Sequence, residues 1–530
     1  MLSQKIHDWS IRCPERVAHR HGNSVLTYAS LESRSNSVAV WLHELNLTEE
    51  ITRQTPVIVY GHKENEMLVL FMACVKAGHP YIPVDSSVPA ERLWQIIEAS
   101  GARAVLSPQI VPKGNASHKV MIEEMILLDG QGSILKGYQL EVPSSSWQVQ
   151  PDEVYYIIYT SGSTGVPKGV QITLRALESF LNWVNPAFQP EEMNEVFLNQ
   201  APFSFDLSVM DLYMSLSTGG TLWSVDKNQI ANPKELFASL ASSKTSYWVS
   251  TPSFAEVCLM DPSFNDTLLP QVKRFLFCGE ILTHDCATKL AQRFPRAKVE
   301  NLYGPTEATV AVTTLTITQD ILNGFNPLPV GSVKPDALVL ICDTDQLTAT
   351  IAAEKGLLPQ RPETLSEGEA GELVIAGPNV SVGYLNNSEQ TAKAFFSWQE
   401  QGVTWNAYRT GDSGLFKDGF LFYQGRLDFQ VKLHGYRIEL GEIEENLRRL
   451  AMVENAVVLP IERRGKVEYL QAFITVSKPV EDEFKATLAL KEDLRRHLPE
   501  YMIPRRFKFL EKMPMTPNGK ADRRALLGGQ

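Results

Sequence analysis

The chain has 530 residues, which exceeds one ordinary hydrophobic core and predicts two or more domains. Hydrophobic residues make up 44% and charged residues 21%, values typical of a soluble globular enzyme. The net charge of −11 argues against general nucleic-acid binding. Six scattered cysteines without a Cys-x-x-Cys pair favour a reduced, cytoplasmic protein. The longest apolar run near the N-terminus, 67–75, is too short to span a bilayer, so we expect no membrane insertion.

Strand-like and helix-like patterns alternate from residue 1 to about residue 425. In chain order they predict strands at Pro56–Tyr60, Arg103–Leu106, Val154–Ile158, Tyr247–Ser250 and Arg274–Phe277, and helices at Glu64–Ala77, Leu207–Ser215 and Glu235–Ala241. Repeated β-α units predict a layered α/β architecture with largely parallel sheets. The Pro-, Gly- and Glu-rich segment 356–371 indicates an exposed connection.

From residue 411 the alternation of strand-like and helix-like segments shortens into β turns. A turn at 417–419 precedes a predicted helix at Glu442–Ala451, strands at Ala456–Pro460 and Leu470–Val476, and a helix at Leu488–His497. About 100 such residues suffice for a small α+β domain. We therefore expect a large N-terminal domain (1–427) and a small mobile C-terminal domain (428–530), with Asp428 as the hinge. Residues 491–524 hold ten Lys/Arg against five Asp/Glu, which indicates either a solvated face or a contact surface for phosphates or an acidic partner protein.

One loop indicates phosphate chemistry. Residues 159–169 contain four aliphatic hydroxyls, three glycines and a lysine, directly after the apolar strand Val154–Ile158. Glycine lets backbone N–H groups approach anionic oxygens, hydroxyls donate further hydrogen bonds, and lysine adds positive charge. The spacing differs from that of a Walker A loop, so a generic P-loop ATPase is not indicated. A Ser/Gly-rich linker is the alternative, but linkers seldom follow an apolar strand.

Five further segments occur in the order expected of one superfamily. They are 205–208 (FDLS), 301–307 (NLYGPTE), 408–412 (YRTGD), 425–428 (GRLD) with 432–439, and 517–520 (PNGK). Together with the phosphate loop they resemble the adenylate-forming superfamily of acyl-CoA synthetases, peptide-synthetase adenylation domains and luciferases, over essentially the whole chain. Segments 60–62, 77–85, 203–211, 276–280 and 428–437 resemble the branch that ligates D-alanine to a carrier protein in teichoic-acid (cell-wall) D-alanylation. Segment 343–367 looks longer than in that branch and is expected outside the active site.

The resemblance implies roles in ATP binding. Lys520 would bridge the substrate carboxylate and the α-phosphate, and Glu307 would hold Mg²⁺. Tyr303 would stack on adenine, Asn301 would hydrogen-bond the amino edge of adenine, and Asp412 would accept hydrogen bonds from the ribose hydroxyls. The full set of remaining ATP-binding residues would be Thr160, Ser161, Thr164, Lys168, Asn301, Tyr303, Thr306, Asp412 and Arg426. As plain structure, Lys520 would be one more basic-tail lysine, Glu307 a solvated loop acid and Tyr303 a packed turn residue.

The resemblance also implies a substrate site. Asp206 would pair with the α-ammonium of an amino acid, although it could equally be the N-cap of the helix that follows. The apolar walls of the side-chain pocket would be Leu207, Met210, Cys278, Leu302, Val310 and Ala311. Such walls suit a small apolar side chain. Cys278 would favour the D-enantiomer by crowding one face of Cα, unless it is an ordinary buried cysteine.

The implied reaction joins D-alanine and ATP, with Mg²⁺, into D-alanyl-AMP, and then transfers the D-alanyl group to a phosphopantetheine thiol. The chain leaves no room for a carrier domain, so the acceptor would be a separate carrier protein. The small domain would rotate about Asp428, with Lys520 serving the first step and the strand 432–437 facing the site in the second. Alternatives are a stand-alone adenylation enzyme for L-alanine, glycine or another small amino acid, an acyl-CoA or aryl-acid ligase, and a catalytically silent nucleotide-binding scaffold.

Overall fold

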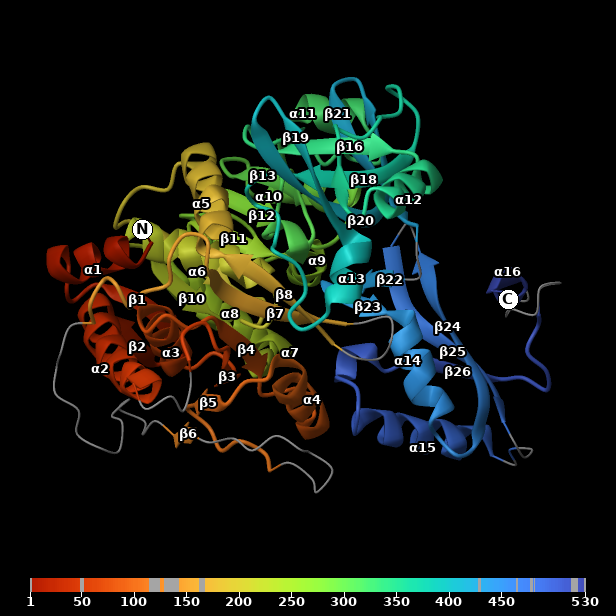
Figure 1. Cartoon of the computed structure of the whole chain (residues 1–530), viewed down its shortest axis with the longest axis horizontal. Coiled ribbons are helices and arrows are strands. Elements are labelled where there is room, and N and C mark those ends of the chain that lie inside the picture. Colours follow the sequence, from red (N-terminus) through yellow and green to blue (C-terminus); the bar gives the residue numbers. More distant parts are fainter. Residues whose placement is uncertain are drawn as a thin grey trace.

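A computed structural model gives the structure of the chain. It describes residues 2–47, 52–113, 124–127, 143–161, 167–427, 430–463, 466–476, 480, 482–515 and 523–528. Figure 1 shows a large domain of layered sheets and helices and a smaller C-terminal group of elements, coloured blue, packed against one side of it. The fold class is thus the expected one: layered α/β with a small α+β domain.

Two large sheets form the body of the large domain. Within the described residues the first has nine strands in the order β15-β14-β13-β12-β11-β9-β10-β1-β2, and the second has six in the order β6-β5-β3-β4-β7-β8. The first sheet comprises β1 (Val17–His21), β2 (Ser24–Thr27), β9 (Val196–Asn199), β10 (Thr221–Ser224), β11 (Tyr247–Ser250), β12 (Arg274–Phe277), β13 (Lys298–Tyr303), β14 (Thr313–Thr316) and β15 (Ser332–Val333). The second comprises β3 (Val57–Gly61), β4 (Tyr81–Asp85), β5 (Ala104–Ser107), β6 (Glu124–Leu127), β7 (Val154–Thr160) and β8 (Lys168–Thr173).

Both sheets are buried on two faces, because apolar residues alternate between two cores. In β11, Tyr247 and Val249 enter a central core, whereas Trp248 enters an outer one. In β3, Val57 and Val59 face the same central core and Ile58 faces the other side. Strands buried on both faces read as continuous apolar runs, and their parallel pairing requires helical crossovers. The prediction of largely parallel sheets is confirmed for these two.

Helices fill the layers between and outside these sheets. The helices described in the large domain are α1 (Leu2–Arg12), α2 (Tyr28–Leu47), α3 (Asn65–Lys76), α4 (Ala90–Ser100), α5 (Leu174–Phe188), α6 (Leu207–Thr218), α7 (Lys227–Ala231), α8 (Pro233–Ser243), α9 (Pro252–Leu259), α10 (His284–Arg293), α11 (Gln319–Gly324), α12 (Thr344–Ala353) and α13 (Ser388–Ala394). Helices α3, α5 and α6 supply the central core, and α4 covers the outer face of the second sheet. None of the helices within the described residues is long and apolar enough to cross a membrane.

The third sheet of the large domain departs from the prediction. It runs β16-β18-β20-β19-β17, with β21 also paired to β20, and it is mainly antiparallel. Its strands are β16 (Leu338–Cys342), β17 (Leu357–Leu358), β18 (Gly371–Ala376), β19 (Phe395–Glu400), β20 (Val403–Lys417) and β21 (Phe420–Arg426). Two-residue turns join β19 to β20 and β20 to β21, which permits their antiparallel pairing without helical crossovers. Segment 343–367 is partly structured: α12 packs on the outer face of this sheet.

The small domain contains a hairpin of β22 (Gln430–Leu433) and β23 (Tyr436–Glu439) and a sheet of β24 (Val453–Arg463), β25 (Lys466–Val476) and β26 (Arg506–Phe509). Helices α14 (Leu440–Arg448) and α15 (Glu483–Arg495) cover one face of this sheet, and α16 (Arg523–Gly528) lies on the other. The predicted helix at 488–497 in fact begins five residues earlier, where Asp482 caps α15. The proposed hinge Asp428 lies outside the described residues.

Candidate active site

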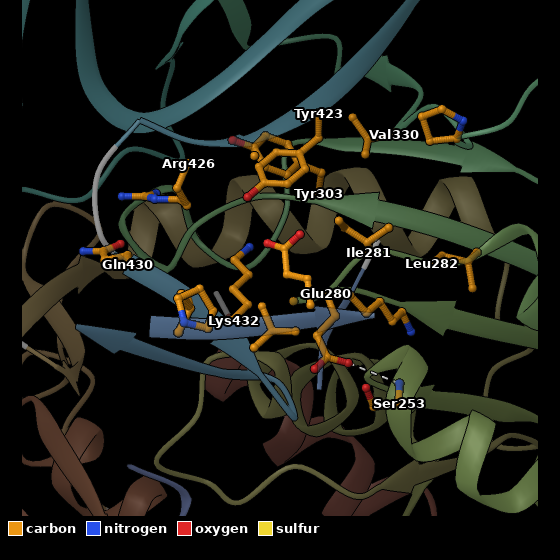
Figure 2. Close-up of a pocket in the computed structure, with 18 of the residues that line it drawn as sticks. Ser253, Glu280, Ile281, Leu282, Tyr303, Val330, Tyr423, Arg426, Gln430 and Lys432 are labelled. Atoms are coloured by element: carbon orange, nitrogen blue, oxygen red, sulfur yellow. Dashed lines mark hydrogen bonds between the residues drawn. The ribbon is translucent and has the colours of Figure 1, made fainter. Parts of the chain in front are cut away.

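A cavity of about 410 Å³ lies where the large domain meets the hairpin β22–β23. Figure 2 shows the rings of Tyr303 and Tyr423 on one side of this cavity, with Lys432 of the small domain and Glu280 across from them. Tyr303 ends β13, Tyr423 comes from the third sheet and Glu280 follows β12. The cavity therefore opens at the carboxyl ends of parallel strands, the usual position of ligands in open α/β sheets.

One wall of the cavity has the groups expected for a nucleoside. The amide Nδ2 of Asn301 donates to the Pro329 carbonyl at 2.8 Å, which leaves its side-chain oxygen as an acceptor. The Tyr303 hydroxyl donates to Asp412 Oδ2 at 2.6 Å, and Arg426 donates to Asp412 Oδ1 at 2.8 Å. The structure thus brings together four predicted ATP-binding residues: Asn301, Tyr303, Asp412 and Arg426. Each carboxylate oxygen of Asp412 retains a further lone pair for a ribose hydroxyl.

Glu307 lies in the short 3₁₀ helix Thr306–Ala308 and is 1% exposed, so it is not a solvated loop acid. It accepts two hydrogen bonds from the Arg437 guanidinium, at 2.7 and 3.0 Å, and one from the Tyr384 hydroxyl at 2.8 Å. Burial by itself would raise the pKa of this carboxyl, but Arg437 and Tyr384 outweigh burial and lower it to about 2. Glu307 is a hard oxygen ligand of the kind Mg²⁺ takes beside phosphate. It fits that role once Arg437 is displaced.

The described ends of the phosphate loop contact the small domain. The Ser161 hydroxyl donates to the Arg437 carbonyl at 2.7 Å and accepts from the Glu439 N–H at 3.2 Å. Lys168 Nζ lies 3.5 Å from Glu439 Oε1. Thr160, paired with Lys168 in the β7–β8 hairpin, and Thr306 line a second, smaller cavity beside this seam. The loop therefore joins two antiparallel strands, and Thr164 lies outside the described residues, as does Lys520.

Asp206 precedes α6 and is 8% exposed. It holds the N-cap position of the helix, yet its side chain makes no capping hydrogen bond. Burial raises the pKa of its carboxyl to about 6, although a hydrogen bond from Thr306 and the charge of Lys432 act in the opposite direction. A buried carboxylate not used for capping is suited to pair with a cationic ligand group.

The six predicted pocket residues belong to one buried apolar cluster, the central core: Leu207, Met210, Cys278, Leu302, Val310 and Ala311. Burial raises the pKa of the Cys278 thiol to about 12, so it stays neutral, and its Sγ contacts the Val310 carbonyl at 3.4 Å. Val310 has a φ of 69°, which a β-branched residue rarely adopts. The backbone of Ala311 passes so close to Gly304 that a Cβ there would collide with it.

Four residues that make contacts in or beside the site were not predicted as site residues from the sequence. Arg437, Glu439 and Tyr384 surround Glu307 and Lys168, and buried Lys63 donates to the Ala201 carbonyl in the loop that leads to Asp206. The strand 432–437 is predicted to face the site, which is the signal that could have singled out Arg437, and Glu439 belongs to the same motif, 432–439. Lys63 carries no such signal, because a buried lysine cannot be distinguished from a surface one by residue type alone.

Comparisons with known proteins agree with this geometry. The AMP-binding enzyme family matches residues 6–385, and the AMP-binding enzyme C-terminal domain matches residues 442–520. D-alanine--D-alanyl carrier protein ligases of Bacillus cereus (strain AH187) and Bacillus thuringiensis (strain Al Hakam) are each 48% identical over 527 residues, covering 99% of both chains.

Solved structures show the same fold at low identity. A Vibrio cholerae adenylation domain in complex with glycyl-adenosine-5′-phosphate has a TM-score of 0.79 at 22% identity, covering 100% of this chain and 98% of that one. A holo nonribosomal peptide synthetase protein with adenylation and PCP domains has a TM-score of 0.77 at 24% identity, covering 100% and 84%.

Proposed function

The chain belongs to the AMP-binding enzyme family, and from that premise we propose that it activates D-alanine as D-alanyl-AMP and transfers the D-alanyl group to the phosphopantetheine thiol of a separate carrier protein. The relatives named D-alanine--D-alanyl carrier protein ligase align with 99% of the chain at 48% identity, which supports the same reaction here. The chain is thus an amino-acid adenylating ligase.

One observation carries the proposal: Asp206 is a buried carboxylate that directly precedes residues of the apolar central core and does not cap its own helix. A carboxylate in such a place is costly unless a cation pairs with it. The α-ammonium of an amino acid supplies that cation, whereas a fatty or aryl acid would leave the charge unpaired. The surrounding aliphatic walls suit a methyl side chain.

In the first half-reaction the carboxylate of D-alanine attacks the α-phosphate of ATP, an acyl–phosphate bond forms, and pyrophosphate leaves. Two anions must approach each other, so the site has to offset their repulsion. We assign the ribose to Asp412, the adenine to Tyr303 and Asn301, and the bridging positive charge to Lys520. Mg²⁺, held by Glu307 and phosphate oxygens, would neutralise negative charge on the phosphates when bound.

In the second half-reaction a thiol attacks the carbonyl carbon of D-alanyl-AMP. The thioester C–S bond forms, the acyl–phosphate bond breaks, and AMP and one proton leave. Lys432 points into the cavity and lies 5.9 Å from the centre of the Tyr303 ring, so its ammonium is placed near the AMP end of the intermediate. Positive charge at that end favours departure of AMP.

The deciding experiment is ATP–pyrophosphate exchange with purified protein and D-alanine, L-alanine, glycine and octanoate as alternative substrates. We expect D-alanine to support exchange far better than the others. Preference for L-alanine or glycine would assign the chain to another small amino acid, and exchange with octanoate alone would overturn amino-acid activation. Formation of a thioester on holo-carrier protein then tests the transfer step.

The small domain is proposed to change position between the half-reactions, with the boundary at Asp428. The reaction consumes ATP, and all six cysteines are unpaired thiols, which supports a cytoplasmic site of action.

A further inference from the structure

In the described arrangement, the small domain engages groups that the proposed function assigns to the phosphates of ATP and their Mg²⁺. Ser161 and Lys168, two described groups of the phosphate loop, are engaged by Glu439 and by the backbone of the β22–β23 hairpin. Arg437 occupies both oxygens of Glu307. The nucleoside groups around Tyr303 are still reached from the cavity. This arrangement therefore accepts an AMP-bearing intermediate, and ATP can bind only when the hairpin has moved away.

An ion pair outside the reacting groups spans the two domains in this arrangement. Arg92 Nη1 on α4 lies 2.6 Å from Glu442 Oε1 on α14, and the two side chains are 7% and 0% exposed. Beside the pair, the rings of Tyr436 and Tyr501 stack at 3.7 Å. Arg92, Tyr436 and Tyr501 all line the small cavity at the seam. When the hairpin leaves the site, α14 moves with the small domain, and the pair must separate.

We propose that Arg92 and Glu442 are positioning residues that hold the small domain in the transfer arrangement and so favour thiol transfer over ATP binding. The inference rests on the proposed function for its two half-reactions, but the pair itself is a feature of the structure. Their proposed effect is on the placement of the hairpin, not on the reacting groups.

The Arg92–Glu442 pair matters more than a second ion pair between the domains because it is more deeply buried. A second ion pair between the domains joins Lys466 to Glu256 at 2.9 Å, but its side chains are 20% and 35% exposed. Such part-hydrated pairs contribute little, whereas removal of one member of a buried pair is costly. Glu442 also lies in the first turn of α14, where its charge remains favourable after separation. The penalty of losing Arg92 thus falls mainly on the closed arrangement.

The test compares Arg92→Met with the wild type in each half-reaction. We expect D-alanine-dependent pyrophosphate exchange within about twofold of wild type, and single-turnover transfer from D-alanyl-AMP to free pantetheine slower by about 10- to 100-fold, as for loss of one member of a buried ion pair. Arg92→Met combined with Glu442→Leu removes both charges and should restore most of the transfer rate. The matched control is Glu445→Gln, which breaks pairs with Arg448 and Arg449 within the small domain and should change neither rate.

Equal losses in both half-reactions, or unchanged transfer in Arg92→Met, would overturn the proposal. A second readout does not depend on D-alanine. It is the distance between spin labels at Glu98 on α4 and Arg448 on α14, both exposed, measured with AMP alone. Wild type should give a short, narrow distance distribution and Arg92→Met a broader, longer one. If wild type fails to exchange with D-alanine while the label distances still differ, the proposed function is wrong and the positioning role stands. Identical distributions would refute the positioning role whatever the substrate.

Discussion

Replacement of Asp206 by asparagine isolates the charge that the proposal assigns to substrate recognition. Asparagine ranks with aspartate as a helix N-cap, so Asp206→Asn keeps the shape and capping capacity of the residue and removes only its charge. Because the side chain makes no capping hydrogen bond in the structure, α6 should not lose stability either.

The magnitude follows from the environment of the carboxyl. Burial raises the pKa of the Asp206 carboxyl to about 6, which means that holding the charge without a cationic partner from the substrate costs about 3 kcal/mol. An arriving ammonium offsets that cost and adds the attraction of a buried pair. Without the charge, the ammonium itself is buried unpaired, a loss of about 3 kcal/mol, and kcat/KM for D-alanine should fall by about two orders of magnitude.

Pyrophosphate exchange across D-alanine concentrations, with calorimetric titration of ATP alone, measures this effect. ATP affinity and the melting temperature should stay near the wild-type values. The matched control is Asp226→Asn, the same replacement at a carboxylate that caps α7 through Asn228 and Gln229, and it should leave D-alanine kinetics unchanged. If ATP binding collapses together with D-alanine activation, Asp206 is a structural residue and the assignment of an amino-acid substrate loses its main support.

Three further outcomes are expected. Because a protonated Asp206 cannot pair with the ammonium, kcat/KM for D-alanine should be level above pH 6 and fall about tenfold per unit below it, and the pH profile of Asp206→Asn should lack this limb. Cys278→Gly should admit L-alanine and change the D/L ratio of exchange rates by about 10- to 200-fold, whereas an unchanged ratio would mark the thiol as ordinary core. Lys520→Ala should slow exchange by about 10² to 10³ and spare transfer from preformed D-alanyl-AMP, and equal damage to both steps would contradict a role confined to the first.

Much of the fold follows from local sequence patterns. The bounds of β11 and β12 agree with the prediction at both ends, because each is a short apolar run buried on both faces and flanked by polar residues. The third sheet was not predicted, since its longest strand, β20, mixes polar and apolar residues over 15 positions and passes through Gly411 and Gly414. Glycines interrupt a strand pattern, and pairing with β18, β19 and β21 stabilises the strand regardless.

Residue types and motif order could locate the site, but they could not predict how the small domain is placed over it. The proximity of Tyr303, Asp412 and Arg426 follows from motifs at the ends of neighbouring strands. The contact of Arg437 with Glu307 could not be predicted, because these residues are 130 positions apart in sequence and their contact depends on how the two domains are placed. Pairing across such an interface is a tertiary property, and no local pattern encodes it.

The burial of Glu307 links the chemistry to the motion of the small domain. A carboxylate with 1% exposure is stable as an anion only beside a cation, and here Arg437 supplies it and holds the pKa of the carboxyl near 2. If the hairpin withdraws, Glu307 loses the Arg437 guanidinium. The buried Glu307 carboxylate is then unfavourable unless another positive charge enters together with the polyphosphate. We therefore expect arrival of ATP and departure of Arg437 to be coupled through one buried charge. If Lys168 binds phosphate as proposed, we expect the small domain to return only after pyrophosphate has left, because Glu439 would otherwise meet phosphate oxygens at Lys168.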